Sequence, residues 1–152
     1  MFEPGHVAYG KLPGAAAAAA IIASAGNLAA FFLAKEMLGV PFLMPTDPGS
    51  TSLAPLTPYD VVFACALPAI GAGIFLIIID KLDKRPFPVF FCVSAFFLIF
   101  SVAFPVSLPD SVSFGTKISL EVMHMIGAVS IVGAFMKLAR ADEDEEEEEE
   151  SE

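Results

Sequence analysis

Four long stretches of the chain are continuously apolar and are separated by short polar segments. Residues 15–34, 61–79 and 87–105 contain no charged side chain, and residues 118–138 contain only Glu121, His124 and Lys137 as titratable groups. A helix of about 20 apolar residues crosses the hydrocarbon core of a bilayer. Lipid cannot form hydrogen bonds with exposed backbone N–H and C=O groups, so a spanning segment is a helix or part of a closed barrel. No stretch alternates between apolar and polar residues as a barrel strand would. The pattern therefore predicts four membrane-spanning helices, at about residues 15–38, 58–80, 86–105 and 117–139.

The ends of these stretches carry residues that start and stop helices. Thr57 can cap the second helix, with Pro58 at its first position and Asp60 in its first turn. Gly39, followed by Pro41, is a typical end for the first helix. The local signals thus agree with the boundaries that hydropathy predicts.

The composition supports the same fold class. The chain has 152 residues, of which 56% are hydrophobic and 17% charged, and its mean hydropathy is +0.72. These values exclude a disordered chain and a nucleic-acid binder. We expect an all-α protein, a four-helix transmembrane bundle with a disordered acidic C-terminal tail. Its parts are an N-terminal segment (residues 1–14), a membrane domain (residues 15–140) and the tail (residues 141–152).

The net charge of −10 comes from the tail. Residues 142–152 hold ten acidic side chains and no basic ones. Subtracting these ten from the 18 acids leaves eight, which balance the eight Lys and Arg residues. Such a run of like charge is typical of a solvated, disordered tail. A docking tail for a basic partner is the alternative interpretation.

The basic residues predict the orientation of the bundle. With four spans, both termini share one side with the loop between the second and third spans. That side holds six Lys and Arg residues near the span ends, against two on the other side. Cytoplasmic loops carry the excess of Lys and Arg. We therefore expect a multi-pass protein of the cytoplasmic (plasma) membrane with both termini in the cytoplasm. The loop 39–57 is then external, and the sequence leaves open whether it covers the bundle.

Polar residues inside the spans are costly, so their positions are informative. At a rise of about 1.5 Å per residue, polar side chains from all four spans fall in the outer half of the membrane: Asn27, Cys65, Ser101, Glu121 and His124. Glu121 and His124 are also neighbours on one helix face. The candidate polar or ligand-binding cluster at the outer mouth consists of Asn27, Ser101, Glu121 and His124.

Small residues predict where helices approach closely. The first helix has a stripe of Ala and Ser on the face of Asn27, and such stripes let helices pack closely. In the second helix, Pro68 lacks an N–H and frees the carbonyl of Ala64. We expect these residues to mediate helix packing: Ala23, Ser24, Pro68, Gly71 and Gly127.

Two interpretations of the polar cluster stay open. Asn, Ser and His often form hydrogen bonds between membrane helices, which would make the cluster structural. The same residues can instead bind a small ligand, a proton or an ion. Glu121 and His124 are too few to ligate a metal, and a haem would want two axial ligands. We therefore expect no metal, no cofactor and no catalytic residue.

The preferred function is a non-enzymatic accessory or scaffold subunit. The alternatives are a small transporter, channel-like or sensor protein that uses the outer cluster, and, more weakly, a membrane oxidoreductase. The expected partners are the lipid bilayer, a membrane-protein partner or second copy of the chain, and a basic partner for the tail, with nucleic acid excluded.

The order of several short motifs resembles a family of unknown function, composed of small prokaryotic four-span membrane proteins. The features that carry the resemblance cover residues 15–140: Asn27, Gly39-Val40-Pro41, Pro68, Arg85-Pro86, Ser101, Pro105 and Met123-His124. The resemblance implies the fold and the membrane location, suggests Asn27 and His124 as site residues, and implies no activity. Glu121 and the acidic tail are outside it.

Overall fold

The structure is a computed structural model that describes residues 6–47, 50, 52–101 and 103–141. In this part of the chain, four long helices dominate: α1 (Leu12–Phe32), α2 (Pro58–Leu82), α3 (Pro86–Ser101) and α5 (Phe114–Leu138). A 3-10 turn (Tyr9–Lys11) precedes α1, a π-helical turn (Leu33–Met37) prolongs it, and α4 (Ala103–Val106) follows α3. With these extensions, each of the four is long and apolar enough to cross a membrane. The predicted all-α bundle is confirmed, whereas the tail lies outside the described residues.

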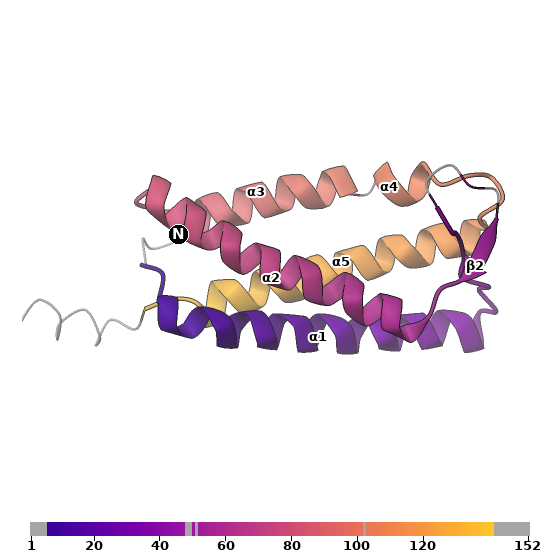
Figure 1. The fold of residues 1–152 in the computed structure, drawn as a ribbon, viewed down its shortest axis with the longest axis horizontal. Coiled ribbons are helices and arrows are strands. Elements are labelled where there is room, and N and C mark those ends of the chain that lie inside the picture. The colour runs from indigo at the N-terminus through magenta and orange to yellow at the C-terminus, as the bar shows by residue number, and fades with distance from the viewer. Residues whose placement is uncertain (1–5, 48–49, 51, 102, 142–152) are drawn as a thin grey trace, which may run out of the picture.

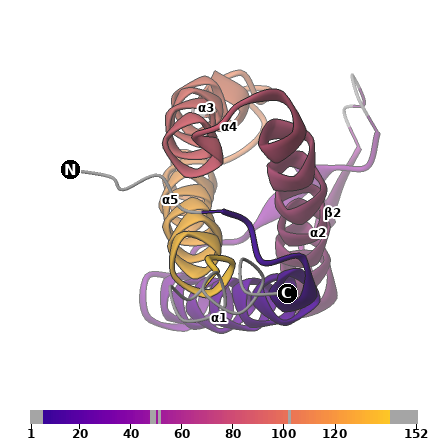
Figure 2. The ribbon, with the colours of Figure 1, turned by 90° about the vertical axis from the view of Figure 1, so that its left-hand side faces the viewer.

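The helices run side by side along one long axis (Figure 1). Viewed along that axis, α1 and α3 lie on opposite sides, with α2 and α5 between them (Figure 2). Helix α1 makes most of its contacts with α5 and α2. The described chain ends and the α2–α3 turn lie at one end of the bundle, here called the termini end (Figure 1). The other end, called the hairpin end, carries the β1–β2 hairpin.

Capping residues fix the helix starts. The Thr57 side chain accepts from the Asp60 N–H, and the Asp60 carboxylate accepts from the Thr57 N–H at 2.8 Å, so the predicted cap of α2 is confirmed as a capping box. Helix α5 begins at Phe114, earlier than hydropathy predicts, because the Ser113 hydroxyl accepts from the Thr116 N–H at 3.1 Å. Hydropathy does not detect this helix start, because the cap and much of the first turn are polar.

The loop between α1 and α2 packs onto the hairpin end. Strands β1 (Leu43–Pro45) and β2 (Leu53–Pro55) pair antiparallel. Just before them, Phe42 is buried, with its ring centroid 4.7 Å from that of Phe31 in α1. Phe42 adopts a φ of 46°, an uncommon value for a residue with a Cβ. Burial of the ring offsets that strain, and the hairpin is thereby anchored to the bundle.

Two hydrophobic clusters hold the helices together. The cluster at the hairpin end contains Phe31, Phe42, Val61 and Met123. The larger cluster reaches the termini end, where Phe90 lies 6.0 Å from Phe135 between ring centroids. The chain ends close this side, since the Ala8 N–H donates to the Ala139 carbonyl at 3.0 Å.

Helices α1 and α5 pack tightly against each other at Gly26. A Cβ added to Gly26 would lie 2.8 Å from the Cγ2 methyl of Ile126. That methyl group is on a β-branched side chain, which has little rotamer freedom in a helix. Helix α1 contains a second glycine, Gly14, whose added Cβ would meet no atom within 4 Å. The two glycines therefore differ in what an added Cβ would meet.

We predict that Gly26→Ala destabilises the bundle by about 1–3 kcal/mol, the usual cost of overpacking. Thermal unfolding in detergent, followed by circular dichroism at 222 nm, measures the change. The matched control, Gly14→Ala, should be neutral or stabilising by up to about 1 kcal/mol, because alanine favours helix. Equal midpoints for the two variants would contradict the close approach of α1 and α5.

Candidate functional site

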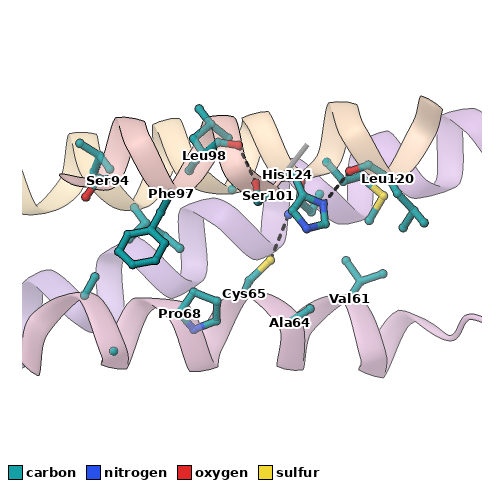
Figure 3. A pocket seen from close by; sticks show the side chains of 18 of the residues that line it. Val61, Ala64, Cys65, Pro68, Ser94, Phe97, Leu98, Ser101, Leu120 and His124 are labelled. Carbon is teal, nitrogen blue, oxygen red and sulfur yellow. Dashed lines mark hydrogen bonds between the residues drawn. The ribbon is translucent and has the colours of Figure 1, made fainter. Parts of the chain in front are cut away.

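A cavity of about 650 Å³ lies between α2, α3 and α5, and Asn27 contributes to it from α1. Leu56 and Asp60 line it toward the hairpin end, and Phe75 and Phe90 toward the termini end. Figure 3 shows side chains from several helices around this space. Its volume is in the range of sites for drug-sized molecules.

Helix α3 buries side chains in the core only near its start. The described buried side chains of α3 are Pro86, Phe87 and Phe90, all in its first turns. Beyond Phe90 the helix lies along the cavity without burying further side chains in the core. Opposite it, the walls contain small residues that leave the space open: Ala64, Gly71, Ala72, Gly127 and Ala128.

The cavity opens at the surface of the bundle. Pro68 of α2 and Phe97 of α3 both line it. Both are also exposed, Phe97 to 62% of its surface. The cavity is therefore open to the outside of the bundle between α2 and α3.

Asn27 is the most buried polar side chain of the predicted cluster, with 6% of its surface exposed. Its Nδ2 donates to the Cys65 thiol at 3.1 Å, which links α1 to α2. Gly127 makes room for the amide, since a Cβ there would lie 3.4 Å from Nδ2. The Oδ1 atom is buried and has no hydrogen-bond partner among the described residues. The oxygen of this buried amide therefore lacks a hydrogen-bond partner in the described structure.

His124 and Ser101 line the same cavity but bond within their own helices. The Nδ1 atom of His124 lies 2.9 Å from the Leu120 carbonyl oxygen. Because a carbonyl only accepts, Nδ1 is the donor of this bond, and in the tautomer with the proton on Nδ1 the Nε2 atom is an acceptor. The Ser101 hydroxyl donates to the Leu98 carbonyl at 2.8 Å. In Figure 3, His124 extends toward α2, on the side of Ala64 and Cys65.

Glu121 is not among the residues that line the cavity. It is half-buried, and its Oε1 is a buried acceptor without a hydrogen-bond partner in the described part of the chain. Lys117, one turn earlier, donates to the Leu108 carbonyl at 2.6 Å. The structure thus brings Asn27, Ser101 and His124 to one cavity and leaves Glu121 beside it.

The predicted packing residues lie in different surroundings. Ala23 is buried between helices, Ser24 is half-buried, and Gly127 is both buried and part of the cavity wall. Pro68 and Gly71 line the cavity, and a Cβ added to Gly71 would meet no atom within 4 Å. Their place is therefore the cavity wall. In α2, Gly73 makes the close contact, since its added Cβ would lie 3.4 Å from the Phe135 ring.

Sequence reasoning placed Cys65 at the right depth but left it out of the cluster. Its thiol is the partner of Asn27, and the shared depth of the two residues was the available signal. The contribution of Leu56, from the loop, had no signal in the sequence. Among the described residues, no group of three His, Cys, Asp or Glu side chains is placed to hold a metal ion.

Comparison with known proteins places the chain in a family. Searches of curated proteins and of solved structures found no match. The model of the family of unknown function DUF6069 matches residues 7–141, which include all the predicted spans. This match confirms the predicted resemblance. Because it covers most of the chain, the protein belongs to the family of unknown function DUF6069.

Proposed function

We propose that this protein binds a small, lipid-soluble ligand in the cavity between α2, α3 and α5, and that it acts without catalysis. The observation that carries the proposal is Asn27, a buried amide that lines the cavity and whose Oδ1 has no partner in the described residues. Buried polar groups in native structures are nearly always hydrogen-bonded. A ligand in the cavity supplies the missing partner.

The size of the cavity supports the same proposal. Unfilled space in a protein interior costs stability, because the lining atoms lose packing contacts. Gly71 and Ala64 line the cavity without filling it, although larger apolar residues fit a membrane helix equally well. Small side chains at these positions are consistent with an occupant that completes the packing.

Of the functions that the sequence left open, a sensor or binding protein that uses the polar cluster fits this geometry best. The His124 and Ser101 side chains bond within their own helices, so they do not join helices. Asn27 joins α1 to α2 through Cys65, which keeps a structural role for one member. The accessory or scaffold role, with a membrane-protein partner or second copy, stays a prediction.

We predict that Gly71→Leu prevents ligand binding while the helices still assemble, because the added side chain enters the open cavity. Protein purified in a mild detergent and analysed by native mass spectrometry measures the co-purified small molecule. The wild-type protein should retain an adduct that Gly71→Leu loses at least tenfold.

The matched control for this experiment is Gly133→Leu. Gly133 is an exposed glycine of α5 that does not line the cavity, and its added Cβ also meets no atom within 4 Å. This variant should retain the adduct at the wild-type level. Equal adduct in Gly71→Leu and Gly133→Leu would count against the cavity as the binding site.

We further propose that the protein lies in the plasma membrane with both chain ends in the cytoplasm. The support is the excess of Lys and Arg near the span ends on the side of the termini and the α2–α3 turn. In this orientation, the hairpin and the adjacent half of the cavity belong to the outer leaflet.

Cysteine labelling in intact cells tests this orientation. We expect a membrane-impermeant maleimide to label Asp47→Cys, an exposed position beside the hairpin. Lys84→Cys, an exposed position in the α2–α3 turn, should react only after the membrane is permeabilised. The reverse pattern would place the chain ends outside.

A further inference from the structure

We infer that the ligand is a neutral, lipid-soluble molecule that carries a hydroxyl group, which it donates to acceptors in the cavity wall. This inference rests on the proposed function, because it names the chemical class of the molecule that the cavity binds. It follows from which hydrogen-bonding atoms the protein has already used and which it leaves over.

Three polar side chains of the cavity direct a donor at an acceptor of the protein. The Ser101 hydroxyl proton is directed at the Leu98 carbonyl, at 2.8 Å. The Nδ1 proton of His124 is directed at the Leu120 carbonyl, at 2.9 Å. The Asn27 amide donates through Nδ2 to the Cys65 thiol. The acceptors left over on these side chains are the Ser101 Oγ, the His124 Nε2 and the Asn27 Oδ1. The donors that remain in the described lining are the second Nδ2 proton of Asn27 and the Ser94 hydroxyl, so the unpartnered Oδ1 carries the inference.

The backbone of α2 adds a fourth acceptor. Pro68 has no N–H, so it cannot bond the carbonyl of Ala64 one turn earlier. Both residues line the cavity. Acceptors therefore come from helices α1, α2, α3 and α5. A ligand that only accepts hydrogen bonds, such as an ether or a ketone, leaves all of them unpaired, whereas a hydroxyl group pairs with at least one.

The charge of the lining selects a neutral molecule. Asp60 is the acidic residue of the described lining, and its Oδ2 already accepts from the Thr57 N–H and hydroxyl at 2.8 and 2.7 Å. The rest of the wall is mostly apolar, as its Leu, Val, Ile and Phe residues show. An anion in such a place would lose its hydration without gaining a counter-charge, at a large cost in free energy. A cation would meet only the Asp60 carboxylate, which already bonds Thr57 at the hairpin end. The opening between Pro68 and Phe97 gives a lipid-soluble molecule access to the cavity.

A matched pair of probes tests the donor requirement. 4-(Trifluoromethyl)phenol and 4-(trifluoromethyl)anisole differ only in that a methyl group replaces the hydroxyl proton. Fluorine NMR titrations of the protein in lipid nanodiscs give both dissociation constants, each referred to the probe concentration in protein-free nanodiscs. We expect the phenol to bind about tenfold more tightly than the anisole, the ratio typical of one hydrogen bond.

Three variants locate the acceptors. Asn27→Leu and His124→Phe each remove one acceptor at similar volume, and the variant that removes the acceptor used by the phenol should lower the preference for the phenol to about threefold or less. Two variants are used because Asn27→Leu also removes the bond to Cys65 and can affect assembly. Met125→Leu is the control, since Met125 is 55% exposed and lies outside the cavity lining. It should keep the wild-type preference.

Each outcome decides between the two proposals. Equal binding of both probes to the wild-type protein would overturn the donor requirement and leave the ligand site standing. Binding of neither probe would overturn both proposals. A phenol preference that survives in Asn27→Leu and in His124→Phe would overturn the assignment of the acceptors.

Discussion

The hydrocarbon core of a membrane offers no hydrogen bonds, and this constraint shapes the whole molecule. Helices satisfy the backbone within each span, and the Thr57–Asp60 capping box satisfies the exposed start of α2. Polar side chains in the spans obey the same constraint when they turn back to their own helix, as Ser101 and His124 do. Asn27 obeys it only in part, because a side-chain amide has both donors and an acceptor and the cavity wall uses only the donor side.

The position of the cavity follows from where the large side chains lie. The fully buried aromatic residues lie at the two ends, with Phe31 and Phe42 under the hairpin and Phe87, Phe90 and Phe135 near the termini. Between them, α1 is held tightly to α5 by small residues such as Gly26. Helix α3 takes part in the packing only through its first turns. The bundle is thus firmly closed at both ends and loosely packed in between, and this arrangement keeps a cavity open without loss of the fold.

Much of this could be predicted from the sequence, and the part that could not has a physical reason. Hydropathy fixes the spans, and helical rise places Asn27, Cys65, Ser101 and His124 at one depth, where all four line the cavity and Cys65 also bonds Asn27. Periodicity gives the direction of a side chain only relative to its own helix axis. It does not say which neighbour covers that face. Gly71 therefore suggests close packing but lies at an open wall, and Glu121 shares the stripe of His124 but lies outside the lining.

Hydrogen-bond free energies distinguish a structural role for the Asn27 amide from a role in ligand binding. Hydrogen bonds between membrane helices contribute about 0.6 kcal/mol on average and at most about 1.7 kcal/mol. A thiol is a weak acceptor, so the bond from Asn27 to Cys65 belongs in the lower part of that range. A buried polar atom without a partner costs about 1–3 kcal/mol. In the unliganded state the Oδ1 of Asn27 therefore costs as much as, or more than, the Nδ2 bond contributes. An apolar residue in place of Asn27 would avoid that cost, so stability alone does not account for the amide. A hydroxyl donor in the cavity makes the net contribution of Asn27 to stability favourable. It bonds Oδ1, which removes the free-energy penalty there, and it fills the space beside the amide.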